Sequence, residues 1–172
     1  TLYTSLFDGA NLKLNSLLAP RGDVVDNVFE FDKTDYRYSS SLNGTVEISG
    51  TTYRVFNKFQ GTDSLYNQMI PMIRISEMYM IAAETSTDGP TRLGYFNTFR
   101  NHRNLASVRE RDVDYYLEKE WKKEFYGEGQ LFFWYKRNKK TEMQSATVQY
   151  GTVSVKLSNY VLPIPDAESQ YN

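Results

Sequence analysis

The chain has 172 residues, with 20 Lys and Arg against 21 Asp and Glu and a formal net charge of -1. This balance excludes a broad positive surface for nucleic acid or anionic lipid, and the lack of cysteine excludes disulfides, thiolate nucleophiles and cysteine-based zinc sites. The length suits a single unit, 1–172, and because the sequence starts at Thr1 without a methionine, we expect a processed product or a fragment of a longer protein.

The first part of the chain, residues 1–70, predicts an irregular segment followed by a small β-meander. Pro20 and Gly22 interrupt a stretch without a hydrophobic period, so we expect that stretch to run over the surface. Polar and apolar residues alternate from residue 35 onward, which predicts about three antiparallel strands. Asn-Gly tolerates the positive φ angles of a type I′ turn, and it provides one of two turn signals. The signals are Asn43-Gly44 and Ser49-Gly50.

Residues 71–138 predict a helical core. Pro71 suits the first position of a helix over PMIRISEMYMIAAETS, and Asp88-Gly89-Pro90 separates it from a second helix, which predicts an antiparallel hairpin. Its span is close to the roughly 34-residue period of tetratricopeptide units. A third helix begins near Asp112. In the first helix the residues expected to be buried are Met72, Ile75, Met78, Tyr79 and Ala82, and Ile73 and Ile81 widen this stripe. In the second helix they are Leu93, Phe96, Phe99 and Arg103. In the third helix they are Val113, Tyr116, Leu117, Trp121 and Phe125, and the residues expected to face solvent are Glu118, Lys119, Lys122 and Lys123.

The stretch EFYGEGQLFFWYKR, residues 124–137, crowds aromatic rings around two glycines. Gly127 and Gly129 take a left-handed conformation without steric cost, so the third helix is expected to end there and a short fourth helix to follow. We interpret the cluster as a packed joint of the scaffold in which rings from both helices fill the wedge. The residues expected on one side of the fourth helix are Leu131, Trp134 and Tyr135.

Residues 139–172 predict a β-hairpin and an extended tail. The segment SATVQYGTVSVKL alternates around Tyr150-Gly151, as is typical of a hairpin. The segment NYVLPIPDAE is expected to run extended because Pro163 and Pro165 disfavour helix in the residues before them. The predicted fold is therefore mainly α with small antiparallel β elements, in which tetratricopeptide-like helical hairpins pack with β-hairpins and long loops.

The sequence shows no catalytic constellation. The single histidine, His102, has no cysteine, second histidine or nucleophile elbow beside it, so we expect it to be satisfied locally or to face solvent. Two carboxylate pairs share helix faces, as a glycosidase would need, but solvated faces or local pairing with Arg74 and lysines explain them better. Four aspartates match no EF-hand, so neither a metal site nor a cofactor is predicted. The pairs are Glu77 with Glu84 and Glu120 with Glu124, and the aspartates are Asp23, Asp26, Asp32 and Asp35.

Aromatic residues make up 15% of the chain. Most are expected to fill the edge of the core, because a tyrosine ring packs while its hydroxyl stays solvated or paired. Five from the early region have no helix to pack on as part of an amphipathic stripe, so they are the candidate ligand-binding residues, with core filling as the alternative. They are Tyr3, Phe29, Phe31, Tyr36 and Tyr38.

Four segments resemble the C-terminal part of the SusD/RagB family of outer-membrane nutrient-uptake lipoproteins of Bacteroidetes. Their order, their spacing and the closing Leu-Pro-Ile-Pro all resemble that family. Any one of them would be a weak signal, whereas four in register are fairly specific. The segments are PMIRISEMYMIAAE (71–84), YFNTFRNHRNL (95–105), EWKKEFYGEGQLFFWYKR (120–137) and NYVLPIPDAE (159–168).

The resemblance implies a cell-surface protein that captures a glycan or oligosaccharide, or else a peptide, for import through a TonB-dependent SusC-like channel in the outer membrane. Binding and delivery are implied, with no bond broken. The resemblance also implies a lipid anchor outside this chain and an N-terminal half, rich in tetratricopeptide-like hairpins, that this sequence lacks. Ligand residues of the family lie outside the four segments, so none is carried over.

A second hypothesis stays open, in which the chain is a helical-repeat scaffold that binds proteins and no small ligand. The hairpin predicted over residues 71–104 suggests it, because one such unit needs neighbours to cover its open face. A third hypothesis, a glycosidase, depends only on the spacing of carboxylates.

Overall fold

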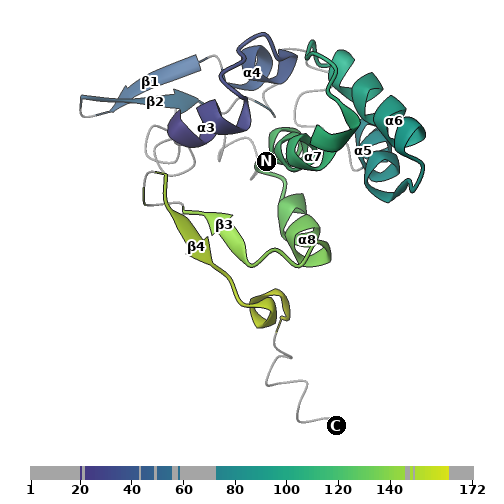
Figure 1. Ribbon diagram of the computed structural model, residues 1–172. Coiled ribbons are helices and arrows are strands. Elements are labelled where there is room, and N and C mark those ends of the chain that lie inside the picture. Colours follow the sequence, from purple (N-terminus) through teal and green to yellow (C-terminus); the bar gives the residue numbers. More distant parts are fainter. Residues whose placement is uncertain are drawn as a thin grey trace. The chain divides into compact units, whose positions relative to one another are not determined.

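The structure, a computed structural model, describes residues 20, 22–42, 44–48, 50–55, 58, 73–145, 148 and 150–162. Within these residues it contains six α-helices, two short 3-10 helices and two two-stranded antiparallel sheets (Figure 1). The fold is mainly helical with small antiparallel β elements, as predicted.

The chain divides into two compact units, Thr1–Glu124 and Phe125–Asn172. The sequence predicted a single unit, 1–172, with regions 1–70, 71–138 and 139–172, and this stays a prediction. The division between the two compact units falls at the end of the third predicted helix, immediately before the glycine-rich break.

The first helix of the first unit, α3 (Gly22–Val28), lies where the sequence predicted a surface loop. Val25 and Val28 are buried on one helical face, and Asp23 in the first turn suits the positive end of the helix dipole. The prediction of an irregular segment around Gly22 was therefore wrong. A helix this short makes about two turns, too few for a hydrophobic period to stand out in the sequence.

The next helix, α4 (Tyr36–Ser41), replaces the first strand of the predicted meander. Its N-cap is Asp35, whose carboxylate accepts a 2.9 Å hydrogen bond from the backbone N–H of Arg37, and Tyr38 is buried. Such a capping side chain favours a helix start over continued extension. The strand prediction was wrong here because alternation over a few residues also fits a single helical turn.

A two-stranded sheet follows, with β1 (Gly44–Ile48) antiparallel to β2 (Thr51–Val55). The adjacent ends of these strands pair directly, so the turn is at the second predicted signal, where Gly50 has a φ of 78°. The expected turn at Asn43-Gly44 was wrong, because its glycine is already the first residue of β1. In the described part of this region the meander has two strands, where three were predicted.

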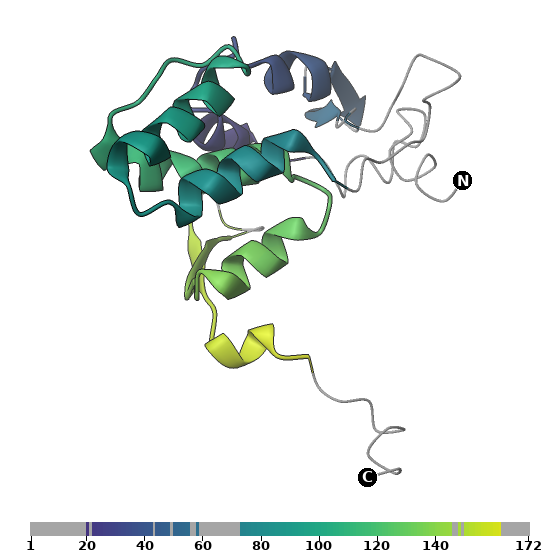
Figure 2. The same cartoon turned by 90° about the vertical axis from the view of Figure 1, so that its right-hand side faces the viewer.

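Helices α5 (Ile75–Thr85) and α6 (Gly89–Asn101) lie side by side as a hairpin (Figure 2). Asp88 caps α6 by accepting a 2.9 Å hydrogen bond from the Thr91 N–H, and a proline occupies the first turn. The predicted boundary between the two helices is therefore confirmed. Helix α5 starts later than expected, and Pro71, its predicted first residue, lies outside the described residues.

The buried face of α5 differs from the predicted stripe. Apolar side chains occur on more than one face of this helix, and periodicity alone does not tell which face the rest of the chain covers. Helix α6 lies against the face of Ala83, whose carbonyl oxygen accepts a 3.0 Å hydrogen bond from Arg92 Nε. The buried residues are Ser76, Met80 and Ala83. Of the predicted residues, Ile73, Ile75 and Met78 are 81%, 77% and 47% exposed, Tyr79, Ile81 and Ala82 are half-buried, and Met72 lies outside the described residues.

A 3-10 turn, η1 (Glu110–Asp112), leads into α7 (Val113–Glu124), which starts where the sequence predicted. Lys123 was expected on the wet side of this helix but is buried, together with two glutamates of the same helix. That expectation was wrong because the partners of these charges come from distant segments. The buried residues of the predicted stripe are Val113, Leu117, Trp121 and Phe125.

The second unit begins with a break in helical geometry at Gly127 and Gly129, whose φ angles are 75° and 76°. Helix α8 (Gln130–Arg137) follows, with Trp134 buried. The predicted break and the predicted short helix are both confirmed.

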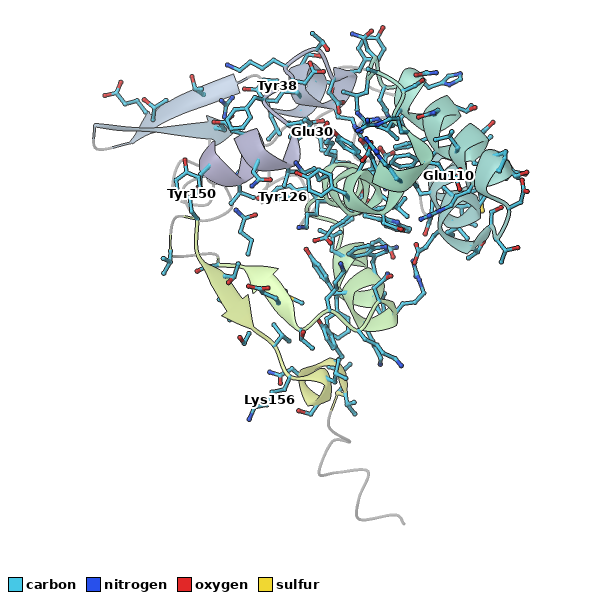
Figure 3. The ribbon with its side chains drawn as sticks, viewed as in Figure 1. Glu30, Tyr38, Glu110, Tyr126, Tyr150 and Lys156 are labelled. Carbon is cyan, nitrogen blue, oxygen red and sulfur yellow. The ribbon has the colours of Figure 1, made fainter. Side chains whose placement is uncertain are left out.

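A β-hairpin completes the described part of this unit. Strand β3 (Glu142–Gln144) pairs with β4 (Thr152–Ser154), and Tyr150 lies at the tip of the hairpin with a φ of 53° (Figure 3). A hairpin with its second strand after Tyr150-Gly151 is therefore confirmed, but its first strand precedes the predicted segment, which began at Ser145. A 3-10 turn, η2 (Leu157–Tyr160), includes two residues that were expected to be extended, and the two prolines of the tail lie outside the described residues.

Candidate functional site

Eight charged side chains gather inside the first unit. They come from the turn after α3, the start of α4, the end of α6 and α7, and Figure 3 shows Glu30 between α3 and α7. Acids and bases balance, so the set has no formal net charge. This buried charge cluster comprises Glu30, Asp35, Arg37, Arg100, Arg103, Glu120, Lys123 and Glu124.

Glu120 lies at the centre of the buried charge cluster and is fully buried. One carboxylate oxygen accepts hydrogen bonds from Arg100 Nη1 at 2.6 Å and from Lys123 Nζ at 3.1 Å, and the other accepts from the Arg37 guanidinium. Burial by itself raises the pKa of Glu120, but the charges of these three cations outweigh burial and lower the pKa below its ordinary value. The carboxylate is therefore ionised in the folded chain.

Glu124 is the second anionic position of the cluster. Its carboxylate accepts hydrogen bonds from Arg103 Nη2 at 3.0 Å and from Arg37 Nη1 at 3.1 Å. Burial raises the pKa of Glu124, but the hydrogen bond from Arg103 and the charges of Arg37 and Arg103 lower it to about 2. Arg37 Nη2 also donates a 2.7 Å hydrogen bond to Asp35, so one guanidinium ties α4 to α7.

The buried charge cluster is a structural tie and not a reaction centre. Glu120 has no exposed surface at which a substrate could reach it. A solvated helix face or local pairing with lysines was expected for this pair. The solvated face was wrong, because cations from other elements bind both carboxylates, whereas Glu120 does pair with Lys123 of the same helix. A glycosidase needs an accessible acid and an accessible base or nucleophile, and this pair does not provide them.

The cluster reaches the surface at Glu30. This residue occupies the left-handed position that ends α3, with a φ of 60°, where glycine is usual. The N–H of Phe31 bonds to the Asp26 carbonyl at 2.9 Å, and the N–H of Glu30 bonds to the Asn27 carbonyl at 3.2 Å, which are the two hydrogen bonds of a Schellman motif. The Glu30 carboxylate accepts a 2.8 Å hydrogen bond from Lys123 Nζ, which offsets a backbone strain of about 1–3 kcal/mol.

Phe31 follows this cap and is 79% exposed. An apolar residue at this position of a Schellman motif frequently packs back onto its helix, as Leu105 does after α6, where it is buried. Phe31 departs from that pattern and itself has a φ of 58°. The backbone conformation of the cap therefore keeps the Phe31 ring exposed to solvent.

The five aromatic residues predicted to bind ligand fall into three groups. Phe29 and Tyr38 are buried and meet edge to face with ring centroids 5.5 Å apart, so they fill the core. Phe31 and Tyr36 are 79% and 58% exposed, which leaves their rings accessible. Tyr3 lies outside the described residues.

Sequence reasoning missed Tyr115, which is 63% exposed on α7. Lys119 Nζ lies 4.6 Å from its ring centroid and donates a 3.0 Å hydrogen bond to the Asn27 carbonyl, within the cap that presents Phe31. The sequence did contain a signal for it: Tyr115 is an aromatic residue on the third predicted helix that lies outside the predicted apolar stripe, next to Tyr116. Phe31, Lys119 and Tyr115 together form what we call the aromatic surface.

A second surface feature is an open cavity of about 570 Å³, the polar basin. Its walls come from α6, η1 with the residue before it, and α7, so no single stretch of sequence signals it. The residues that line it are Arg92, Arg109, Glu110, Arg111 and Asp114.

The remaining polar candidates have local partners. His102 is exposed, and its Nδ1 lies 2.8 Å from the Thr98 carbonyl oxygen, as expected of a satisfied surface histidine. Asp32 accepts hydrogen bonds from the hydroxyl and the N–H of Thr34, which lower its pKa. In the part of the chain that the structure describes, no group of three or more potential metal ligands occurs. None of the described helices is long and apolar enough to span a bilayer.

The chain was compared with protein-family models, with curated proteins and with solved structures, and no match was found in any of the three.

Proposed function

We propose that this chain is part of a SusD/RagB-like nutrient-capture protein at the cell surface, which binds a glycan or oligosaccharide without cleaving it and delivers it to a TonB-dependent SusC-like channel in the outer membrane. The observation that supports this most is the aromatic surface. Phe31 and Tyr115 present exposed rings, and Lys119 contacts both the Tyr115 ring and, through the Asn27 carbonyl, the helix cap that carries Phe31.

The chemistry of the aromatic surface suits a saccharide. Aromatic rings offer flat apolar faces to the C–H groups of a sugar, and a few fixed polar groups beside them orient its hydroxyls. The buried charge cluster holds the cap of α3 through Glu30, so Phe31 is ordered before ligand arrives. A preordered ring loses less conformational entropy on binding.

The α5–α6 hairpin gives further support, since the resemblance implies helical hairpins. Three of the four segments that resemble the family lie wholly or mostly in described residues and form helices α5 to α8.

The test is glycan binding by the full-length protein. A panel of plant and host oligosaccharides is screened on an array, and the best binder is titrated by calorimetry. Phe31→Ala and Tyr115→Ala should each weaken binding about tenfold, because each removes a stacking face. Tyr150→Ala, an exposed tyrosine on the β3–β4 hairpin, serves as the matched control. Hydrolysis of the bound glycan, or affinity unchanged in both variants, would contradict the proposal.

A second candidate function, the protein-binding scaffold, is favoured by the exposed apolar face of α5. Ile73, Ile75 and Met78 are exposed on or just before one helix, and contiguous apolar surface of this kind often marks a protein contact. Co-purification with the channel protein separates the two functions. A stable complex that Ile75→Glu abolishes, together with no glycan affinity in the whole panel, would favour the scaffold.

A further inference from the structure

The polar basin combines fixed and free charged groups. Arg92 Nε donates a 3.0 Å hydrogen bond to the Ala83 carbonyl, and its guanidinium is bound by both carboxylate oxygens of Asp114. The charge of this guanidinium is therefore neutralised by Asp114, and its orientation is fixed by Asp114 on one side and by the Ala83 carbonyl on the other. The guanidinium forms a wall of the basin and does not offer a free charge to a ligand.

Glu110 forms another wall and lies against a glycine. A Cβ atom built on Gly89 would lie 2.0 Å from Glu110 Oε1 and 2.5 Å from its Cδ, so the carboxylate lies directly against Gly89, at the end of an exposed and flexible side chain. Figure 3 shows Glu110 beside the α5–α6 pair. Gly89 is the first residue of α6, where the helix dipole favours a negative charge. The acid therefore lies beside the first residue of α6.

Two arginines supply donors that are still available. Arg109 and Arg111 are 70% and 71% exposed, and both direct Nε toward one carboxylate, that of Asp112, at 2.8 Å and 3.9 Å. Within the described residues, the Nη groups of these two side chains have no acceptor. The two guanidinium groups therefore share the Asp112 carboxylate, and the Glu110 carboxylate offsets the positive charge that remains, so what these two arginines offer at the basin is four Nη nitrogens that can donate hydrogen bonds.

From this arrangement we propose that the polar basin binds a small solute that carries a carboxylate, of which an acidic sugar is the type that best fits. The ligand carboxylate lies between Arg109 and Arg111, where guanidinium groups make paired, charge-assisted hydrogen bonds. A hydroxyl of the ligand donates to Glu110. A cavity of about 570 Å³ lies within the size range of small-molecule sites. The site shares no residue with the aromatic surface and does not require the proposed function.

The experiment compares galacturonate with galactose, which differ by the carboxylate alone, in calorimetric titrations of the full chain. Galacturonate should bind at least tenfold more tightly, and its affinity should fall as salt is raised, because exposed charges are screened. The double variant Arg109→Gln/Arg111→Gln should lose that preference. Both side chains are exposed, so folding should be unaffected, and circular dichroism checks this. Arg137→Gln, on α8, is the matched control.

Asp112→Asn gives a result of opposite sign. It removes the carboxylate that competes for both guanidinium groups, so galacturonate should bind several-fold more tightly while galactose is unaffected. Equal affinity for the two sugars, or a double variant that keeps the preference for galacturonate, would overturn the proposal.

Discussion

Glu120 joins three cations from three elements, Arg37 from α4, Arg100 from α6 and Lys123 from the same helix, α7. A buried ion pair as a whole adds little stability over well-packed apolar residues, because desolvation opposes the attraction. Loss of one partner is different, since the charges that remain stay buried without compensation. The stability of the first unit should therefore be most sensitive to its single fully buried glutamate.

Glu120→Gln should lower the free energy of unfolding by about 3–5 kcal/mol, because it leaves three buried cations with one carboxylate fewer. Urea denaturation followed by tryptophan fluorescence measures this, since Trp121 is the next residue. Glu118→Gln is the control, because Glu118 lies on the outer part of the same helix and pairs with Lys122 at 2.8 Å. A surface pair of that kind contributes about 0–1 kcal/mol. Similar losses in both variants would contradict the central role of Glu120.

Acid should destabilise the first unit through Glu124, whose pKa falls from the ordinary 4.5 to about 2 in the folded chain. The unfolded chain binds the proton at a higher pH than the folded chain does. The stabilisation is therefore complete above about pH 4.5 and is lost as the pH falls toward about 2, by an amount on the order of 3 kcal/mol. Thermal unfolding at a series of pH values should show this slope. It should be flatter in Glu124→Gln and unchanged in Glu47→Gln, which alters an exposed strand residue.

At the scale of elements, three helices end in the same way without glycine. Schellman hydrogen bonds close α3, α6 and α8, and the left-handed residues Glu30, Asn104 and Lys139 have φ angles of 60°, 61° and 50°. Glycine would take this conformation without strain. The Glu30 side chain compensates for the strain by its hydrogen bond with Lys123, and the Asn104 side chain donates a 3.1 Å hydrogen bond to the Thr34 carbonyl. The Lys139 side chain, by contrast, is exposed to solvent.

Glycine at two of these positions should have opposite effects. Lys139→Gly should raise the free energy of unfolding by up to about 1 kcal/mol, since it relieves backbone strain and the greater freedom of glycine in the unfolded chain offsets only part of that gain. Glu30→Gly relieves the same strain but removes a carboxylate bound to Lys123 and Arg100, so it should destabilise. Differential scanning calorimetry compares the two. A shift of the same sign in both would mean that the Glu30 carboxylate adds nothing.

Sequence patterns identified helices and strands best where a capping residue, a glycine or a turn motif marks their ends. The boundary at Asp88, the glycine break at Gly127 and Gly129, and the hairpin at Tyr150 were all predicted for this reason. The helix ends at Glu30 and Lys139 carry no such mark, because the residues there are ones that the capping rules do not favour. The buried face of α5 was also missed, since its apolar residues fit more than one stripe.

At the scale of the whole molecule, the first unit leaves an apolar helix face open. Ile75→Glu should change the free energy of unfolding by no more than about 0.5 kcal/mol, because Ile75 is 77% exposed at the start of α5. Ala83→Leu, on the covered face of the same helix, should cost about 1–3 kcal/mol through overpacking. Chemical denaturation of the two variants measures this difference. A large loss in Ile75→Glu would show that the full chain buries this face.

The aromatic surface and the buried charge cluster lay beyond what the sequence could predict, because both depend on contacts between distant segments. Arg37 meets Glu120 at a separation of 83 residues, and Lys123 meets Glu30 at a separation of 93. Phe31 was selected from the sequence, but Tyr115 was not, since its relation to the cap of α3 exists only after α7 has packed on α3. The polar basin was missed for the same reason.

The long separation between opposite charges also affects how the protein is made. While a ribosome synthesises the chain, Asp35 and Arg37 emerge long before Glu120 and Glu124. Until then Arg37 has only its local acid to pair with, and water must hydrate the rest of its guanidinium. The first unit therefore completes its fold late, after α7 has been synthesised, and a chain that stops before α7 lacks the two carboxylates that pair with Arg37, Arg100 and Arg103.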